Sequence, residues 1–189
     1  AHLDLGTHSW KFAADAPAGP SDIRDQATTW DDLEWLASNT KLPIVVKGIM
    51  TGEDGRLAAE SGAKAMIVSN HGTRYLDTTF TTIEVLPEVV DQVAGKAEVY
   101  MDGGIRRGSD VFKALALGAD AVGIGRPYVW GLGAFGEDGV EKVIDLIMAE
   151  FRMVMRQTRT NSIDEITSRF VMEAKNPIMM RHNQWGFGL

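Results

Sequence analysis

Four short apolar segments, each followed by polar residues and then by a helical pattern, constrain the fold of this chain more than any other feature. The segments predicted as strands are residues 42–48, 65–68, 98–101 and 121–124. One predicted helix begins near Thr29, and the others span residues 53–61, 82–93, 109–117 and 139–156. Strands that alternate with helices in this way form a parallel sheet with right-handed crossovers.

Two architectures fit this alternation, a (β/α)8 barrel and an open doubly wound sheet, and both place ligands at the carboxyl ends of the strands. Asp102, Gly103 and Gly104 follow the third strand, and Gly125 and Arg126 follow the fourth. These residues are typical of the phosphate grip that the last two loops of a barrel form. The glycine fingerprint of a dinucleotide-binding fold is missing. The sequence therefore predicts an α/β fold of the TIM-barrel type.

The number of units is half of what such a barrel needs. A complete barrel has eight βα units in about 250 residues, whereas we find four units within these 189 residues. We therefore expect the chain to supply about the last four βα units, a half-barrel that another chain or segment completes. Residues 1–28 are expected to form a loop or linker, residues 29–170 the half-barrel, and residues 171–189 a C-terminal tail.

A half-barrel leaves its sheet edges and inner face open, and such surfaces favour association. The expected partners are a complementary N-terminal half-barrel chain or further copies of this chain, as a homo-oligomer. The net charge of −7 and the isoelectric point near 5.1 disfavour nucleic acid or an anionic membrane as the main partner.

Composition excludes several other kinds of site. The absence of cysteine rules out disulfides, thiolate catalysis and cysteine-based metal sites. His2, His8 and His182 lack metal-ligand spacing, so no metal site is expected. No apolar run approaches the roughly 20 residues of a membrane helix. Because the N-terminus carries no signal-peptide pattern, the expected location is cytoplasmic.

Residues 68–77 carry the most distinctive chemistry. The imidazole of His71 can accept a proton near neutral pH, and the guanidinium of Arg74 can hold a carboxylate by two parallel hydrogen bonds. An isolated histidine and arginine at this spacing also fit an ordinary surface loop. The other strand ends favour a functional site over a surface loop. Lys47 lies at the end of the first strand, and charged or glycine residues follow the third and fourth strands.

Four stretches match, in order, the motifs of one family. They are Leu-Pro-Ile-Val-Val-Lys-Gly, Val-Ser-Asn-His-Gly-Thr-Arg-Tyr-Leu-Asp, Asp-Gly-Gly-Ile-Arg-Arg-Gly-Ser-Asp-Val-Phe-Lys-Ala-Leu-Ala-Leu-Gly-Ala and Ile-Gly-Arg-Pro. They closely resemble the FMN-dependent α-hydroxy acid dehydrogenase/oxidase family, which includes glycolate oxidase and lactate oxidase. The resemblance covers roughly residues 29–166. It implies an FMN enzyme that oxidises a small 2-hydroxy acid to a 2-oxo acid and is reoxidised by oxygen, a quinone or a carrier protein.

The resemblance also implies a role for each site residue. His71 matches the base that removes a proton from the substrate, and Arg74 matches the clamp on the substrate carboxylate. Lys47 matches the lysine at the N1/C2 edge of the flavin, where an ammonium stabilises negative charge on the reduced ring, and Ser69 matches a hydrogen-bond partner of the flavin. The residues that match the ribityl and phosphate contacts are Asp102, Gly103, Gly104, Arg106, Gly125 and Arg126.

The sequence also departs from the family pattern. Thr73 stands where glycine or alanine is usual, and Tyr75 stands where glutamine is common. The first half of the family's barrel, with its substrate-binding tyrosine and the aspartate that orients the histidine, has no counterpart in residues 1–29, so activity is expected to require that half. The alternative is a module that binds FMN or another phosphate ligand, or only assembles, without turnover. A third interpretation, another FMN barrel such as an isopentenyl diphosphate isomerase-like enzyme, is disfavoured by the pairing of His71 with Arg74.

Overall fold

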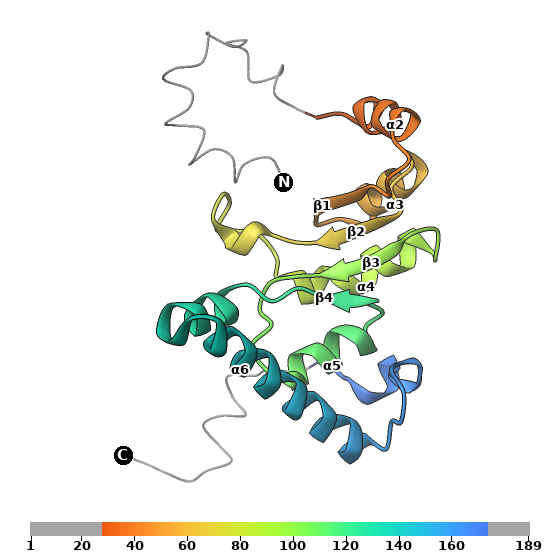
Figure 1. Ribbon diagram of the computed structural model, residues 1–189. Coiled ribbons are helices and arrows are strands. Elements are labelled where there is room, and N and C mark those ends of the chain that lie inside the picture. Colours follow the sequence, from red (N-terminus) through yellow and green to blue (C-terminus); the bar gives the residue numbers. More distant parts are fainter. Residues whose placement is uncertain (1–27, 174–189) are drawn as a thin grey trace, which may run out of the picture.

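The computed structural model describes residues 28–173 (Figure 1). The expected loop over residues 1–28, apart from residue 28, and most of the expected tail over residues 171–189 therefore lie outside the described residues. The helices and strands are α2 (Trp30–Asn39), β1 (Val45–Ile49), α3 (Gly52–Glu60), β2 (Ala65–Val68), α4 (Thr82–Val93), β3 (Glu98–Met101), α5 (Gly108–Ala116), β4 (Ala121–Val122) and α6 (Arg126–Thr158). Short 3₁₀ turns occupy His71–Thr73, Ile163–Glu165 and Ser168–Phe170.

The four strands form one parallel sheet in the order β1-β2-β3-β4. In Figure 1 they are stacked in sequence order, and their arrowheads point to the same side. One helix connects each strand to the next, so the carboxyl ends of all four strands meet at one end of the sheet. This arrangement is an arc of four βα units of a (β/α)8 barrel, and it confirms the predicted fold class.

Local sequence accounts for the ends of the helices. Thr29 caps α2 by accepting a hydrogen bond from the backbone N–H of Asp32, whose carboxylate accepts the Thr29 N–H in return. The hydroxyl of Thr51 accepts from the N–H of Asp54 at 3.1 Å and caps α3 in the same way. Gly118 follows α5 with a φ of 99°, which glycine adopts without the steric cost that other residues bear.

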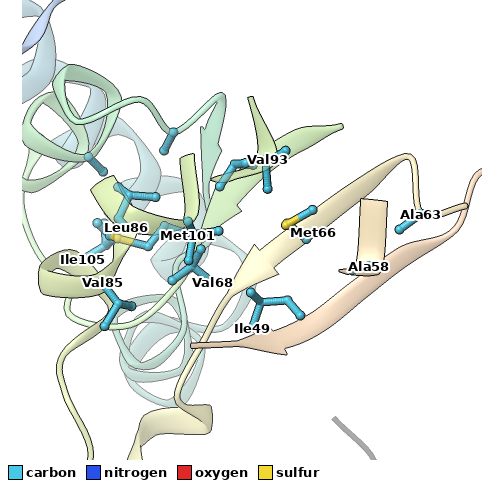
Figure 2. Close-up of a cluster of buried hydrophobic side chains, with 14 of the residues drawn as sticks. Ile49, Ala58, Ala63, Met66, Val68, Val85, Leu86, Val93, Met101 and Ile105 are labelled. Atoms are coloured by element: carbon cyan, nitrogen blue, oxygen red, sulfur yellow. The ribbon is translucent and has the colours of Figure 1, made fainter. Parts of the chain in front are cut away.

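The hydrophobic core lies between one face of the sheet and helices α3 and α4 (Figure 2). Met66 and Val68 of β2 are completely buried, as are Leu86 and Val93 of α4, and Met101 of β3 is 1 % exposed. Burying one such side chain completely contributes about 1.5–3 kcal/mol. The core therefore fixes the strands, and with them the loops that leave their carboxyl ends.

The other face of the sheet points away from these helices and corresponds to the interior of a barrel. Lys47, Ile67 and Tyr100 are paired across β1, β2 and β3, so their side chains share this face. Val45 of β1 is 46 % exposed, and the hydroxyl of Tyr100 donates a hydrogen bond to the carboxylate of Glu98. That hydrogen bond, with burial and the negative charge of Glu98 as further causes, raises the pKa of Tyr100. The inner face is thus open over the described residues.

Two predicted element starts are wrong by three residues or more, and β4 ends at Val122 and not at residue 124. Strand β1 begins at Val45 and not at residue 42, because Pro43 has no N–H to donate to a neighbouring strand. The last helix begins at Arg126 and not at residue 139, and it is kinked at Phe135 and Gly136, whose backbone angles are not helical. Glycines lower helix propensity, and those of residues 131–139 obscured the first segment of α6 in the sequence.

Candidate active site

A β-bulge at the end of β1 directly follows Lys47, which lies on the inner face of the sheet. Lys47 pairs with Ile67, but Ile49 pairs with Val68 and not with the residue after it, so one extra residue is inserted at Gly48. Gly48 has a φ of 104°, which suits glycine. Because of this insertion, Ile49 lies on the buried face beside Val68, while Lys47 keeps its position on the inner face.

Lys47 connects the carboxyl ends of three strands. Its Nζ atom donates to Oγ of Ser69 at 3.0 Å and lies 3.3 Å from Oδ2 of Asp102. Ser69 is completely buried, and its hydroxyl also accepts from the backbone N–H of His71 at 3.3 Å. The ammonium group is therefore held between β2 and β3, with its charge partly balanced by one carboxylate.

The loop after β2 has an unusual backbone. His71, Gly72 and Thr73 have φ values of 54°, 68° and 57°, all in the left-handed region. The side chain of Asn70 accepts from the N–H of Gly72 at 3.1 Å, and the carbonyl of Asn70 accepts from the N–H of Thr73 at 2.9 Å. Non-glycine residues persist in this region only where their surroundings enforce it, and such residues cluster at functional sites.

This loop brings His71 and Arg74 together with Tyr75. Nε of Arg74 donates to the carbonyl of His71 at 3.2 Å. The rings of His71 and Tyr75 meet edge to face, with their centroids 5.6 Å apart, and Cζ of Arg74 lies 5.6 Å from the Tyr75 centroid. The predicted base and the predicted carboxylate clamp are thus neighbours in space as well as in sequence, and they share one aromatic contact.

The loop after β3 is tied down at both ends. The N–H of Asp102 donates to the carbonyl of Val68 at 3.1 Å and extends the pairing of β2 with β3. At the other end, the N–H groups of Arg106 and Arg107 both donate to Oδ2 of Asp110, each at 3.0 Å. Gly103 and Gly104 lie between these anchors.

The loop after β4 leads directly into a helix. Gly125 precedes α6, Arg126 is its first residue, and Pro127 lies in its first turn. Sequence reasoning predicted a phosphate-binding loop here but missed the helix. The signal that could have revealed it is Pro127, since proline is favoured in the first turn of a helix, where its missing N–H costs nothing. A short helix at this position is a common part of the phosphate site of TIM barrels.

All but one of the predicted site residues line a single cavity of about 440 Å³ at the carboxyl ends of the strands. They are Lys47, His71, Arg74, Asp102, Gly103, Gly104, Arg106, Gly125 and Arg126. The exception is Ser69, which lies buried beneath the cavity and contacts Lys47. Gly72 also lines the cavity, between His71 and Arg74, where the sequence suggests that it leaves room for them. Ile105, Gly123 and Ile124 line it as well, and the sequence pattern had pointed to no role for these three.

The cavity is cationic although the whole chain is acidic. Lys47, Arg74, Arg106 and Arg126 contribute four positive side chains, and Asp102 is the single carboxylate among the described residues that line it. A Cβ atom added at Gly104 or Gly125 would meet no atom within 4 Å, so both glycines face open space. Open backbone beside positive side chains suits an anionic group such as a phosphate. The residues present therefore fit a flavin mononucleotide.

Other kinds of site receive no support from the described residues. Within residues 28–173, no group of three or more histidine, aspartate or glutamate side chains could hold a metal ion. Over the same range, no helix combines the length and apolar character that crossing a membrane requires.

A parallel half-barrel with a cationic, glycine-lined cavity and a histidine–arginine pair at its strand ends defines a barrel protein that binds an anionic cofactor. The chain belongs to the FMN-dependent dehydrogenase family, whose sequence profile matches residues 6–173. The family predicted from the sequence is therefore confirmed, and so is FMN as its cofactor.

Relatives and solved structures agree with this assignment. The chain is 55 % identical over 147 residues to the peroxisomal (S)-2-hydroxyacid oxidase GLO4 of Arabidopsis thaliana, covering 78 % of this chain and 40 % of that protein. It is 52 % identical over 145 residues to L-lactate oxidase of Nostoc sp., covering 77 % and 40 %. A crystal structure of mandelate oxidase with benzoyl-formic acid superposes with a TM-score of 0.70 at 47 % identity, covering 72 % of this chain and 41 % of that one.

The chain spans about 40 % of the length of the curated relatives it matches. Some relatives are named as peroxisomal enzymes, so the cytoplasmic location expected from the sequence stays a prediction.

Proposed function

We propose that this chain carries the FMN-binding and catalytic half of an enzyme that oxidises a small 2-hydroxy acid to the corresponding 2-oxo acid. The observation that carries the proposal is the convergence of Lys47, His71, Arg74 and the two phosphate loops on one cavity of about 440 Å³. The relatives include enzymes named (S)-2-hydroxyacid oxidase and L-lactate oxidase, and these names support the same reaction class.

His71 and Arg74 would act on the substrate. Arg74 would hold the substrate carboxylate in a bidentate hydrogen bond, which fixes the orientation of the neighbouring hydroxyl-bearing carbon. His71 would accept the proton that the substrate loses on oxidation. The hydrogen bond from Nε of Arg74 to the carbonyl of His71 supports this division, because it keeps the clamp and the base in a fixed relation.

The remaining cavity residues would hold the cofactor. When bound, FMN accepts the two electrons that the substrate gives up. Lys47 would place its ammonium group beside the flavin ring and stabilise negative charge there, while Ser69 supports it from below. The ribityl chain and the phosphate would be bound by Gly103, Gly104, Arg106, Gly125 and Arg126. Asp102 would lie between these residues and Lys47, with which it forms an ion pair.

We further propose that a complementary half-barrel closes the open face. Helix α2 precedes β1 and α6 follows β4, so the described half-barrel carries a helix at each edge of its sheet. If two copies completed the barrel, β4 of one copy would lie beside β1 of the other at each junction. Helix α6 of the first copy and helix α2 of the second would then occupy the same place. A complement with different ends avoids that collision, so it is favoured over a second copy as the partner that completes the barrel, while homo-oligomers of the completed barrel stay compatible.

The test is the visible spectrum of the purified protein under anaerobic conditions, before and after addition of glycolate, lactate or mandelate. A bound flavin that is bleached by one of these acids supports the proposed reaction. A protein that binds FMN when reconstituted with its complement, yet shows no bleaching with any 2-hydroxy acid, contradicts it.

The second candidate is a module that binds FMN without turnover. It is favoured by the exposure of the inner face, where Val45 is 46 % exposed. Water at this face would solvate the charged groups of the site, whereas catalysis requires water to be excluded from them. Under this alternative the isolated chain binds flavin, and no 2-hydroxy acid bleaches it with or without a complement.

A further inference from the structure

Trp130 has an exposed position that packing alone does not explain. It lies in the first segment of α6, residues 126–135, and 59 % of its surface is exposed. Its ring centroid lies 5.3 Å from Cζ of Arg106, which comes from the loop after β3. This contact joins the loop after β3 to the first segment of α6, which begins at Arg126, so it links the two groups of residues that the proposed function assigns to the phosphate.

The two neighbouring arginines of that loop are held in different ways. Arg107 forms an ion pair with Glu150, with Nη1 and Oε1 3.3 Å apart. Within the part of the chain that the structure describes, Arg106 has no carboxylate partner, and its guanidinium lies over the indole ring of Trp130. Both backbone N–H groups donate to Asp110, so the backbone is equally fixed at both positions and only the side-chain partners differ.

This difference has a chemical consequence. A carboxylate would hold the guanidinium but would also neutralise it and compete with an incoming phosphate. An aromatic face attracts the cation through its quadrupole and leaves the charge and the N–H donors available. Arg106 also lines the cavity, so its orientation and its uncompensated charge both matter to an anionic ligand there.

We propose that Trp130 is a positioning residue that holds Arg106 ready for the phosphate of the flavin. The inference rests on the proposed function, because it takes the anion at Arg106 to be the FMN phosphate. Trp130 acts through Arg106 and does not itself contact the cofactor. The other exposed apolar side chains of the same segment are those of Tyr128, Val129, Leu132 and Phe135. Among the described residues, none of them forms a cation–π contact with an arginine or lysine of the cavity.

The test compares the binding of FMN with that of riboflavin, which has the same ring and ribityl chain but no phosphate. Dissociation constants are measured by flavin fluorescence for the chain reconstituted with its complementary half-barrel, as wild type, Trp130→Leu, Trp130→Phe and the matched control Leu132→Ala. We expect Trp130→Leu to weaken FMN binding about twofold to fivefold, the range for an exposed cation–π contact, and to leave riboflavin unchanged. Trp130→Phe, which keeps a ring, should stay within about twofold of the wild type, and Leu132→Ala should alter neither constant.

A second background tests whether Trp130 acts through Arg106. In an Arg106→Gln chain, adding Trp130→Leu should cause no further loss of FMN affinity. Equal FMN affinity of Trp130→Leu and wild type overturns the inference, as does equal weakening of FMN and riboflavin, or a full effect in the Arg106→Gln background. A wild-type protein that binds no FMN even when reconstituted with its complement, or binds FMN no better than riboflavin, overturns the proposed function as well. Phosphate-dependent binding that is unaffected by the Trp130 substitutions overturns this inference alone.

Discussion

Lys47 and Asp102 form an ion pair across the site, with Nζ and Oδ2 3.3 Å apart. Lys47 lies in β1 and Asp102 directly follows β3, and these two strands are not neighbours in the sheet. Strand β2 lies between them and contributes Ser69, whose hydroxyl accepts a hydrogen bond from the same ammonium group. The pair lies partly open to solvent, with the two side chains 36 % and 27 % exposed. An ion pair this exposed stabilises the fold only weakly, so we expect its main effect to be on the orientation of the Lys47 ammonium group.

Replacing Lys47 by methionine should slow reduction of the bound flavin on the order of 10²–10³-fold, the typical cost of removing a donor from a developing negative charge. The measurement is the rate of anaerobic bleaching by the preferred 2-hydroxy acid in the FMN-loaded enzyme. Lys96→Met is the matched control, because that lysine is 54 % exposed and lies away from the cavity. A bleaching rate within twofold of wild type for Lys47→Met would show that the ammonium group has no part in the reaction.

Replacing His71 by asparagine should lower the turnover rate by about 10²–10⁴-fold, because a positioned general base contributes a factor of that size. FMN affinity should be retained, since the proposed contacts with the cofactor come from other residues. The comparison variant is Arg74→Lys, which keeps the charge but loses the bidentate geometry and should raise KM more than it lowers kcat. If His71→Asn turns over at the wild-type rate, another group must accept the proton.

The left-handed loop after β2 should respond in opposite directions to two substitutions. Gly72→Ala should destabilise the protein by about 1 kcal/mol, because its φ of 68° disfavours a side chain although the space around it is open. Thr73→Gly should stabilise it by about 0.5–1 kcal/mol, because a β-branched residue at a φ of 57° is strained. Urea unfolding at constant m-value measures both. A loss of stability in Thr73→Gly would mean that the threonine hydroxyl, which donates to the carbonyl of Gly72 at 2.7 Å, outweighs the strain.

Much of this fold is predictable from sequence because the constraints are local. Each strand is a short apolar run, and each carboxyl end is marked by a switch to polar or glycine residues. Parallel strands bring those ends together, so the pattern alone is enough to place Lys47, His71, Asp102 and Arg126 in one site. The cavity lining agrees with that expectation.

The features that sequence reasoning missed depend on contacts between distant segments. The bulge at Gly48 becomes visible only in the register of β1 against β2. The contact of Trp130 with Arg106 requires the first segment of α6, whose glycines mask the helical pattern. The buried position of Ser69 beneath Lys47 likewise follows from the packing of the sheet, so its contact with the flavin stays a prediction.

The N-terminus of α4 should lose stability in acid through Glu84. Hydrogen bonds from the hydroxyl and then the backbone N–H of Thr81 hold the pKa of Glu84 below its usual value of 4.5. A depressed folded-state pKa contributes stability above the unfolded value, and this contribution disappears as the pH falls through the folded value. Glu84→Gln should therefore lower the unfolding midpoint at pH 7, and its difference from the wild type should shrink as the pH falls below 4.5. Asp91→Asn, at an exposed position on the same helix, is the control, and a Glu84→Gln difference that persists unchanged at pH 3 would contradict the assignment.

The kink in α6 should couple helix packing to cofactor binding. The two segments of α6 touch through glycines, because a Cβ atom at Gly139 would lie 2.0 Å from the carbonyl oxygen of Gly131. Gly139→Ala must push the segments apart, which should cost roughly 1–3 kcal/mol of unfolding free energy and weaken FMN binding by moving Arg126 at the start of the helix. Gly133→Ala is the matched control, since a Cβ atom there would meet nothing within 4 Å, and helix propensity should make it stabilising by up to about 1 kcal/mol. Thermal unfolding and FMN titration of the two variants separate the effects: if Gly139→Ala loses stability but binds FMN as the wild type does, the first segment of α6 does not position the phosphate site.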